Sequence, residues 1–209
     1  MKTLVAIPCM DMVHTAFMDA LLRLQPVGYT EFAITSSSLI YNARNLLAQK
    51  AVNGGFDRIL WLDSDMVFAP DLLIKLSADM DGGRDFVSAL YFRRKNKIAP
   101  VIFKSTGYTQ NGRELTPFAE CFEDYPKDSV FKVAGCGFGA AIMSVKLVKR
   151  IYAEYGAPFT PQPGFGEDIS FCIRCEQSGI PMYCDSRIKV GHVAQTIVTE
   201  ESYERGVIL

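Results

Sequence analysis

Three short apolar segments alternate with two helical stretches at the start of the chain, and this rhythm constrains the fold more than any other feature. The apolar segments are TLVAIP at residues 3–8, YTEFAITS at 29–36 and RILWL at 58–62. A helical stretch over 13–24 ends before Pro26, and the helical pattern of LIYNARNLLAQKAV ends at a pair of glycines. Alternation of buried strands and helices is typical of an α/β protein with a mostly parallel sheet flanked by helices.

Composition supports a folded domain and excludes several classes of protein. The 209 residues include 49% hydrophobic residues, enough for a buried core and too many for a disordered chain. Lys and Arg (22) nearly balance Asp and Glu (23), so no overall field attracts nucleic acid. No apolar run approaches the roughly 20 residues of a membrane span, and the first residues do not resemble a signal peptide. We therefore expect a soluble, cytoplasmic protein.

The rest of the chain continues the α/β pattern less regularly. We expect a helix beginning at Pro70, strands at 85–92 and 99–105, a long loop or irregular hairpin at 105–128, two strands around a glycine-rich bend at 130–144, a helix at 145–155, a Pro/Gly loop at 157–168, a short helix at 169–179 and extended chain at 181–192. The sequence contains no internal repeat and no low-complexity linker. One domain spanning residues 1–209 fits this organisation best.

Six scattered cysteines give little sign of a disulfide framework or a metal site. A cytosolic chain of this length needs no disulfides, so we expect reduced thiols. Cys172 and Cys175 form a C-x-x-C pair, but they fall inside an expected helix and no second Cys or His pair accompanies them. Packing as small apolar side chains is the favoured interpretation.

Two carboxylates, Asp63 and Asp65, follow the buried segment RILWL directly. Side chains two residues apart on an extended strand face the same way, so this pair could converge on one ligand. Ligands of open α/β sheets collect at the carboxyl ends of the strands. Capping of the next helix is an equally good explanation of the pair taken alone.

Glu167 and Asp168 form a second acidic pair, in the segment FGEDISF, where they open the expected helix. Carboxylates in a first helical turn interact well with the helix dipole, which is ordinary capping. The dipole also keeps a carboxylate ionised, a state that accepts a proton from a hydroxyl group. His192, which follows the strand-like RIKVG, is a third candidate, since imidazole is a common metal ligand.

The order of these features resembles the glycosyltransferases of the GT-A fold, over nearly the whole chain. The segment YNARNLLAQKA before RILWLDSDMVF is similar to the Ala-Arg-Asn helix and D-x-D strand of family 2 and mannan-polymerase-type transferases. The segment AGCGFGAAIMS is similar to the glycine-rich stretch beside the sugar and acceptor pocket. The resemblance implies a Rossmann-like GT-A domain, with a nucleotide-binding half over about 1–65 and an acceptor-binding, catalytic half over about 66–209.

The resemblance also implies a divalent cation. Asp65 would bind the ion, Asp63 would reach the ion or the ribose through water, and His192 would complete the shell. Oxygen ligands with one imidazole suit Mn²⁺, with Mg²⁺ as a substitute. The cation would bridge the diphosphate of a UDP- or GDP-sugar donor and stabilise the leaving group.

The remaining implied roles concern the donor and the acceptor. Asp168 would act as general base on an acceptor hydroxyl, and Glu167 would position the sugar or the acceptor. The nucleotide contacts would come from Arg44, Asn45 and Pro8 as well as Asp63. Arg44 also has a purely structural explanation, as a buried arginine on a helix.

Some expected family features are missing. The region after the second segment, TSSSLIY, lacks the acidic residue that reads uracil in many family 2 enzymes, so the base stays open. The Q-x-x-R-W motif and the transmembrane helices of processive synthases are absent, which argues against a polysaccharide synthase. An acidic pair acting as base favours inversion of the anomeric centre, but the similarity in the Ala-Arg-Asn and D-x-D segments extends to retaining enzymes, so the stereochemistry stays open.

Three other functions compete with a carbohydrate-directed transferase. A nucleotidyltransferase would carry a glycine-rich phosphate loop after the first strand, and VAIPCMDMVH has none. A non-catalytic nucleotide-sugar or carbohydrate-binding protein would keep the fold without turnover. A nucleic-acid acceptor is possible but not favoured by the neutral charge.

Two segments stay ambiguous. The run Arg93, Arg94, Lys95 is interpreted as a solvated loop, with contact to phosphates as the alternative. The end of the chain, VAQTIVTEESYERGVIL, is either a cover over the phosphates or an edge segment that awaits a partner.

Overall fold

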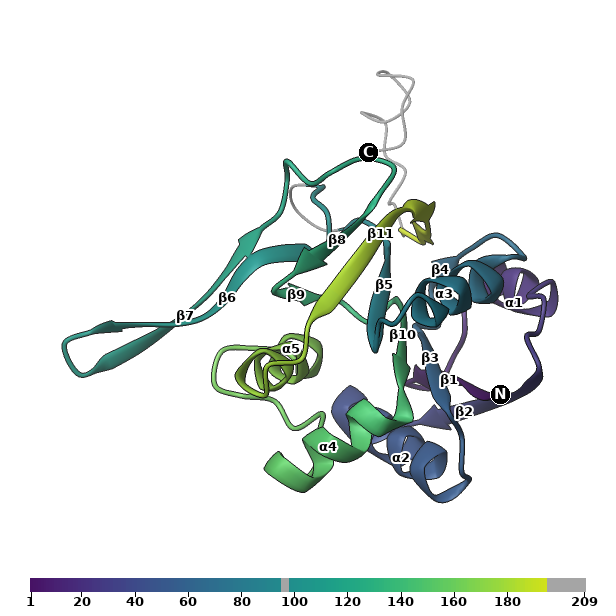
Figure 1. Cartoon of the computed structure of the whole chain (residues 1–209), viewed down its shortest axis with the longest axis horizontal. Helices are drawn as coiled ribbons and strands as arrows, with labels where there is room; N and C mark the ends of the chain where they lie inside the picture. Colours follow the sequence, from purple (N-terminus) through teal and green to yellow (C-terminus); the bar gives the residue numbers. More distant parts are fainter. Residues whose placement is uncertain (95–97, 195–209) are drawn as a thin grey trace, which may run out of the picture.

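A seven-stranded mixed sheet with helices on both faces organises the molecule (Figure 1). The computed structural model describes residues 1–94 and 98–194. The sheet has the order β2-β1-β3-β10-β5-β11-β8. Its strands are β1 (Lys2–Cys9), β2 (Tyr29–Ser36), β3 (Arg58–Leu62), β5 (Phe86–Leu90), β8 (Val130–Val133), β10 (Ala140–Ser144) and β11 (Met182–Lys189). All run in one direction except β10 and β8, which are antiparallel to their neighbours.

The helices divide into two layers because side chains along a strand alternate between the faces of the sheet. Helices α1 (Thr15–Leu22) and α3 (Leu72–Asp81) pack on the face of Leu60 and Leu62. Helices α2 (Ile40–Asn53), α4 (Val145–Tyr155) and α5 (Glu167–Gln177) cover the face of Ile59 and Trp61. Every residue of β3 is therefore buried, which explains its continuous apolar run.

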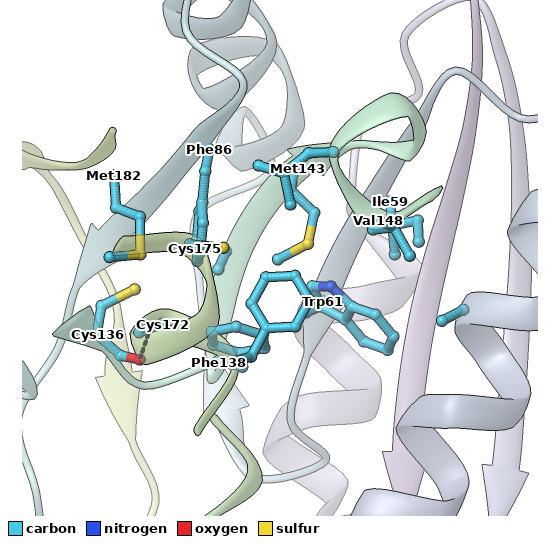
Figure 2. Close-up of a cluster of buried hydrophobic side chains, with 14 of the residues drawn as sticks. Ile59, Trp61, Phe86, Cys136, Phe138, Met143, Val148, Cys172, Cys175 and Met182 are labelled. Carbon is cyan, nitrogen blue, oxygen red and sulfur yellow. Dashed lines mark hydrogen bonds between the residues drawn. The ribbon is translucent and has the colours of Figure 1, made fainter. Parts of the chain in front are cut away.

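Aromatic packing fills the second of these layers. Figure 2 shows Trp61 beside Phe138, with Phe86 close to the cysteines of this region. Phe159 stacks on Phe171 with ring centroids 4.7 Å apart, and it meets the Trp61 ring edge-on at 5.0 Å. Two of these rings, Trp61 and Phe138, contact the Arg44 side chain of the site described below.

The cysteines pack as the sequence predicts. None of the six forms a disulfide, and all six lie in the described residues. Cys172 and Cys175 are buried on α5, where Cys172 donates a weak hydrogen bond to the Cys136 carbonyl oxygen (Figure 2). Burial raises the pKa of the Cys175 thiol well above its ordinary value, so this thiol is kept protonated.

Two small sheets complete the fold. Strands β4 (Met66–Val67) and β12 (Gly191–His192) pair antiparallel, and this pairing was not predicted from the sequence. Strands β6 (Ile102–Asn111), β7 (Glu114–Cys121) and β9 (Gly135–Cys136) form the other sheet. Figure 1 shows the β6–β7 hairpin extending away from the main sheet. The segment expected as a loop or irregular hairpin is thus a regular hairpin with a register shift only near its base.

Helix boundaries otherwise follow the sequence closely. The helix expected over 13–24 spans Thr15–Leu22, and His14 caps its start by accepting a hydrogen bond from the Ala16 backbone N–H. The helix expected at 169–179 begins earlier, at Glu167. In the part of the chain that the structure describes, no helix has the length and apolarity needed to cross a membrane.

Candidate functional site

A polar pocket of about 290 Å³ lies at the carboxyl ends of β1 and β3, between the start of α2 and the start of α5. It is lined by Pro8, Cys9, Met10, Ile40, Arg44, Asp63, Ser64, Asp65, Arg94, Glu167, Asp168 and His192. The pocket therefore brings together both acidic pairs, His192 and two of the three other residues expected at the nucleotide. These residues come from segments more than a hundred positions apart in the chain.

The geometry of the D-x-D pair differs from the prediction. Strand β3 ends at Leu62, and residues 63–65 form a turn in which the Met66 N–H donates to the Asp63 carbonyl oxygen. The expectation that the two carboxylates share one face of an extended strand is therefore wrong. Asp63 turns toward Arg44, whereas Asp65 turns toward Arg94 and His192. Both carboxylates still line the same pocket.

Arg44 is the buried centre of the site. Its Nε donates to Glu167 Oε1 at 2.9 Å, and its Nη2 donates to Asp63 Oδ1 at 2.7 Å. Its guanidinium carbon lies 5.6 Å from the Trp61 ring centroid and 5.4 Å from that of Phe138. Burial lowers the pKa of Arg44, but the charges of Asp63 and Glu167 outweigh burial and raise it. Arg44 thus ties the D-x-D turn to α5.

Asp65 and His192 form the part of the site suited to a cation. His192 Nε2 lies 3.5 Å from Asp65 Oδ2, and the pairing of β12 with β4 fixes this approach. His192 Nδ1 lies 3.0 Å from the Phe92 carbonyl oxygen, so Nδ1 carries a proton and donates. The second nitrogen of a metal-binding histidine commonly donates to a carbonyl in this way, which directs Nε2 at the ion.

Ionisation of this pair follows from its contacts. Burial raises the pKa of Asp65, but its hydrogen bond with His192 and the charges of His192 and Arg94 outweigh burial and lower it. The hydrogen bond to Asp65 raises the pKa of His192 above its usual value. Asp65 is therefore an anionic oxygen ligand at neutral pH, and a bound cation would replace the proton on His192 Nε2.

The donor set fits a divalent cation only in part. Among residues 1–94 and 98–194, no group of three or more His, Cys, Asp and Glu side chains is arranged around one metal position. The expected third ligand, Asp63, is held by Arg44. Asp65 and His192 remain as direct ligands of mixed oxygen and nitrogen type, and such a pair suits Mn²⁺ when a diphosphate supplies further oxygens.

Glu167 and Asp168 occupy the first turn of α5, as predicted. Glu167 accepts a hydrogen bond from Arg44. Asp168 also lines the pocket, and its Oδ1 accepts a 2.7 Å hydrogen bond from the Ile169 N–H. Burial and the neighbouring Glu167 charge raise the pKa of Asp168 to about 6. Burial and the Glu167 charge thus oppose the ionised form of Asp168 that the helix dipole favours.

Pro8 and Asn45 have different outcomes. Pro8 lines the pocket at the end of β1. Asn45 is not among the pocket-lining residues, and its side-chain oxygen accepts a 3.0 Å hydrogen bond from the Phe159 N–H. Asn45 thereby holds the loop after α4, and a contact with nucleotide is not needed to explain its position.

The glycine-rich segment packs closely against Tyr91, which contacts the site residue His192. A Cβ atom on Gly137 would come within 2.0 Å of the Tyr91 hydroxyl oxygen, and one on Gly139 within 2.9 Å of the Tyr91 ring. Tyr91 accepts a hydrogen bond from the Gly139 N–H and meets the His192 ring edge-on at 5.7 Å. These glycines make room for Tyr91, and neither is among the residues that line the pocket.

Arg94 is the site residue that sequence reasoning undervalued. It lies in an exposed loop, as expected, but its Nη1 is 2.6 Å from Asp65 Oδ2, so its side chain also belongs to the site. Lys95 and most of the final segment lie outside the described residues. Arg94 also lines an adjoining pocket of about 740 Å³ together with Met10, Met12 and His14. Its contacts with Asp65 and with the Val193 carbonyl oxygen join residues far apart in the sequence, so only the tertiary structure shows that Arg94 reaches the D-x-D turn.

Comparison with solved structures confirms the GT-A fold. A197 from STIV is similar over 93% of this chain and 87% of its own, with a TM-score of 0.64 and 20% identity. GalNAc-T7, crystallised with UDP, GalNAc and Mn²⁺, is similar over 93% of this chain and 43% of its own (TM-score 0.59, 12% identity). Residues 1–349 of S. aureus TarS match over 92% of this chain and 60% of theirs (TM-score 0.57, 14% identity). No protein-family model and no curated protein sequence matches.

Proposed function

We propose that this protein is a metal-dependent glycosyltransferase that moves a sugar from a nucleotide-sugar donor to an acceptor hydroxyl with inversion. The observation that carries the proposal is the single pocket that gathers Asp65, His192, Asp63 and Asp168 at the carboxyl edge of the sheet. The fold is shared with GalNAc-T7, which was crystallised with UDP, GalNAc and Mn²⁺. We propose a UDP- or GDP-sugar as donor and a carbohydrate as acceptor.

Asp168 is the proposed general base. Its Oδ1 is held by the Ile169 N–H, which orients Oδ2 for an acceptor hydroxyl. The acceptor oxygen attacks the anomeric carbon of the donor, the bond from that carbon to the diphosphate oxygen breaks, and the hydroxyl proton passes to Asp168. With a pKa of about 6, this carboxyl is mostly ionised at pH 7 yet basic enough to take the proton. Direct attack from the face opposite the diphosphate inverts the anomeric centre.

The other residues hold the donor. Asp65 and His192 would bind the cation, which when present neutralises charge on the leaving diphosphate. Asp63, fixed by Arg44, is placed to accept hydrogen bonds from the ribose. Pro8 contributes the wall beside the nucleotide. Glu167 acts through Arg44 and is a positioning residue.

The first experiment measures thermal stabilisation by UDP, GDP, CDP, ADP and TDP, each with and without Mn²⁺. A ligand that binds only the native state raises the melting temperature, by an amount that grows with its concentration over Kd. We expect a metal-dependent shift with UDP or GDP. Absence of a shift with every nucleotide at millimolar concentration would contradict the proposed donor class.

The second experiment separates binding from transfer. Asp65→Ala should lose Mn²⁺-dependent nucleotide binding, whereas Asp168→Asn should keep binding and lose transfer. Asp124→Asn, at an exposed carboxylate outside the pocket, is the matched control and should change neither. Circular dichroism must show all three variants folded, because a lost capping carboxylate alone costs about 1 kcal/mol.

This pair of variants also tests the non-catalytic alternative. A nucleotide-sugar-binding protein would bind the donor in a metal-dependent way without turnover, and Asp168→Asn would then alter nothing measurable. Transfer that survives in Asp168→Asn would remove Asp168 as the base. The anomeric configuration of the product, measured by NMR coupling constants, decides between inversion and retention.

A further inference from the structure

Arg94 contacts the same carboxylate oxygen that the cation site needs. Its Nη1 lies 2.6 Å from Asp65 Oδ2 and donates to the Val193 carbonyl oxygen, also at 2.6 Å. Asp65 Oδ2 is the oxygen that faces His192 Nε2. Arg94 lines both the 290 Å³ pocket and the adjoining 740 Å³ pocket, so it stands at the boundary between them.

Each carboxylate of the D-x-D pair thus has its own arginine, and the two arginines differ in how firmly they are held. The Arg44 side chain is 2% exposed and is fixed by two carboxylates and two aromatic rings. The Arg94 side chain is 35% exposed. A buried ion pair is costly to open, whereas a partly exposed pair is weak and exchanges with solvent and ions. Asp63 therefore keeps a fixed counter-ion, whereas the counter-ion of Asp65 can exchange.

A divalent cation and a guanidinium group compete for Asp65. Both are positive, and both would lie within a few ångströms of one oxygen atom in a site partly shielded from water, where like charges repel strongly. A guanidinium group displaced from a carboxylate pairs equally well with phosphate oxygens. The pocket that Arg94 already lines is where the diphosphate would lie.

We propose that Arg94 is an exchangeable counter-ion: it neutralises Asp65 when no cation is bound, and the cation displaces it onto the diphosphate of the donor. This inference rests on the proposed function, since it needs a cation at Asp65 and a diphosphate in the pocket. Arg94 would then make binding of the cation depend on binding of the diphosphate. Cation entry alone is resisted, and cation entry together with diphosphate is favoured.

The test uses the full chain with two probes, Mn²⁺ alone and inorganic pyrophosphate in the presence of saturating Mn²⁺. Mn²⁺ binding is measured from the EPR signal of the free ion, and pyrophosphate binding by calorimetry. Arg94→Gln removes the guanidinium group at a half-exposed position and should fold normally. Arg113→Gln, at the tip of the β6–β7 hairpin and outside the lining of either pocket, is the matched control for loss of one positive charge.

We expect effects of opposite sign. Arg94→Gln should bind Mn²⁺ alone about fivefold more tightly, because a partly exposed competing ion pair of about 1 kcal/mol is removed. The same variant should bind pyrophosphate about tenfold more weakly, since one charge-assisted hydrogen bond to phosphate is lost. Arg113→Gln should change neither affinity by more than about twofold, because an exposed charge far from the site is screened by salt.

The outcomes separate this inference from the proposed function. If wild type binds Mn²⁺ and Mn²⁺-dependent pyrophosphate but Arg94→Gln binds Mn²⁺ no more tightly, the exchange is wrong while the cation site stands. Tighter Mn²⁺ with unchanged pyrophosphate binding likewise overturns the transfer of Arg94 to phosphate. If wild type shows no Mn²⁺-dependent pyrophosphate binding, the metal-dependent function and the inference both fail.

Discussion

Two clusters of charged residues in the described part of the chain bury opposite partners, one an arginine and the other a pair of carboxylates. In the pocket cluster, Arg44 is buried and its carboxylates, Asp63 and Glu167, reach the pocket surface. In the second cluster, between α3 and β11, Asp79 and Asp185 are buried and Arg187 lies over them with 55% of its side chain exposed. Arg187 contacts Asp185 at 2.8 Å and Asp79 at 3.2 Å.

The comparison shows how placement decides what a carboxylate can do. A carboxylate that meets a ligand must face a pocket, so its compensating cation has to lie behind it, as Arg44 does. The carboxylates of the second cluster are both buried beneath Arg187, where burial and their mutual repulsion favour a proton on one of them. Burial and the neighbouring Asp185 raise the pKa of Asp79 to about 6. The same residue types therefore form a site in one place and a structural contact in the other.

The largest expected effect is that of Arg44→Met. Removing a buried cation leaves Asp63 and Glu167 without their partner, and breaking such a pair costs about 3–5 kcal/mol of unfolding free energy. Urea denaturation followed by circular dichroism measures this loss. A loss below about 1 kcal/mol would show that the Arg44 cluster is not the structural centre of the site.

The pH dependence of transfer gives the next largest effect. Because the pKa of Asp168 is about 6, the base becomes protonated below that pH. The rate should fall about tenfold per unit as pH drops below 6 and level off above it. Initial rates at saturating donor, between pH 5 and 8, measure the profile. A profile that is flat across pH 6 would contradict Asp168 as the base.

Arg187→Met should have a smaller effect than Arg44→Met. Arg187 is half exposed, and after its removal the inward carboxylates can take up a proton, so a loss of about 1 kcal/mol is expected. The same urea denaturation, with both arginine variants side by side, measures the difference. An equal loss in the two variants would remove the distinction between the clusters.

Asp79→Asn should have the smallest effect, and one that depends on pH. The pKa of Asp79 is raised in the folded protein, so the folded state holds a proton that the unfolded state releases, and this contribution to stability falls as pH rises from about 4 to 6. The melting temperature of Asp79→Asn relative to wild type should therefore be higher at pH 7 than at pH 4.5. The same variant should leave the pH profile of transfer unchanged, unlike a change at Asp168.

Much of the fold was predictable because its signals are local. The strands β1, β2 and β3 and the helices α2 and α4 lie where their apolar periodicity and the glycines after them place them. The hairpin at 102–121 was predicted less well. Its strands are mostly exposed and carry no apolar alternation that would identify them.

The candidate site was predictable as a set of residues but not as an arrangement. Both acidic pairs and His192 lie in one pocket, as their positions at the ends of strands and helices indicated. The division of Asp63 and Asp65 between two arginines was not predictable, since the turn after Leu62 rotates them apart. Asn45 follows Arg44 directly on α2, yet its side-chain oxygen accepts a hydrogen bond from the Phe159 N–H, and it does not line the pocket.

The sequence by itself determined the order of strands and helices, the GT-A fold class and the identity of the acidic residues at the sheet edge, because each depends on neighbours within a few positions. Only the tertiary structure decided which arginine or histidine pairs with which carboxylate. The pairing of β12 with β4 brings His192 to Asp65, the loop after β5 brings Arg94 to the same carboxylate, and an ion pair joins Glu167 at the start of α5 to Arg44 on α2. Such contacts join residues up to 127 positions apart, from Asp65 to His192, and their strength depends on burial, which no local pattern records.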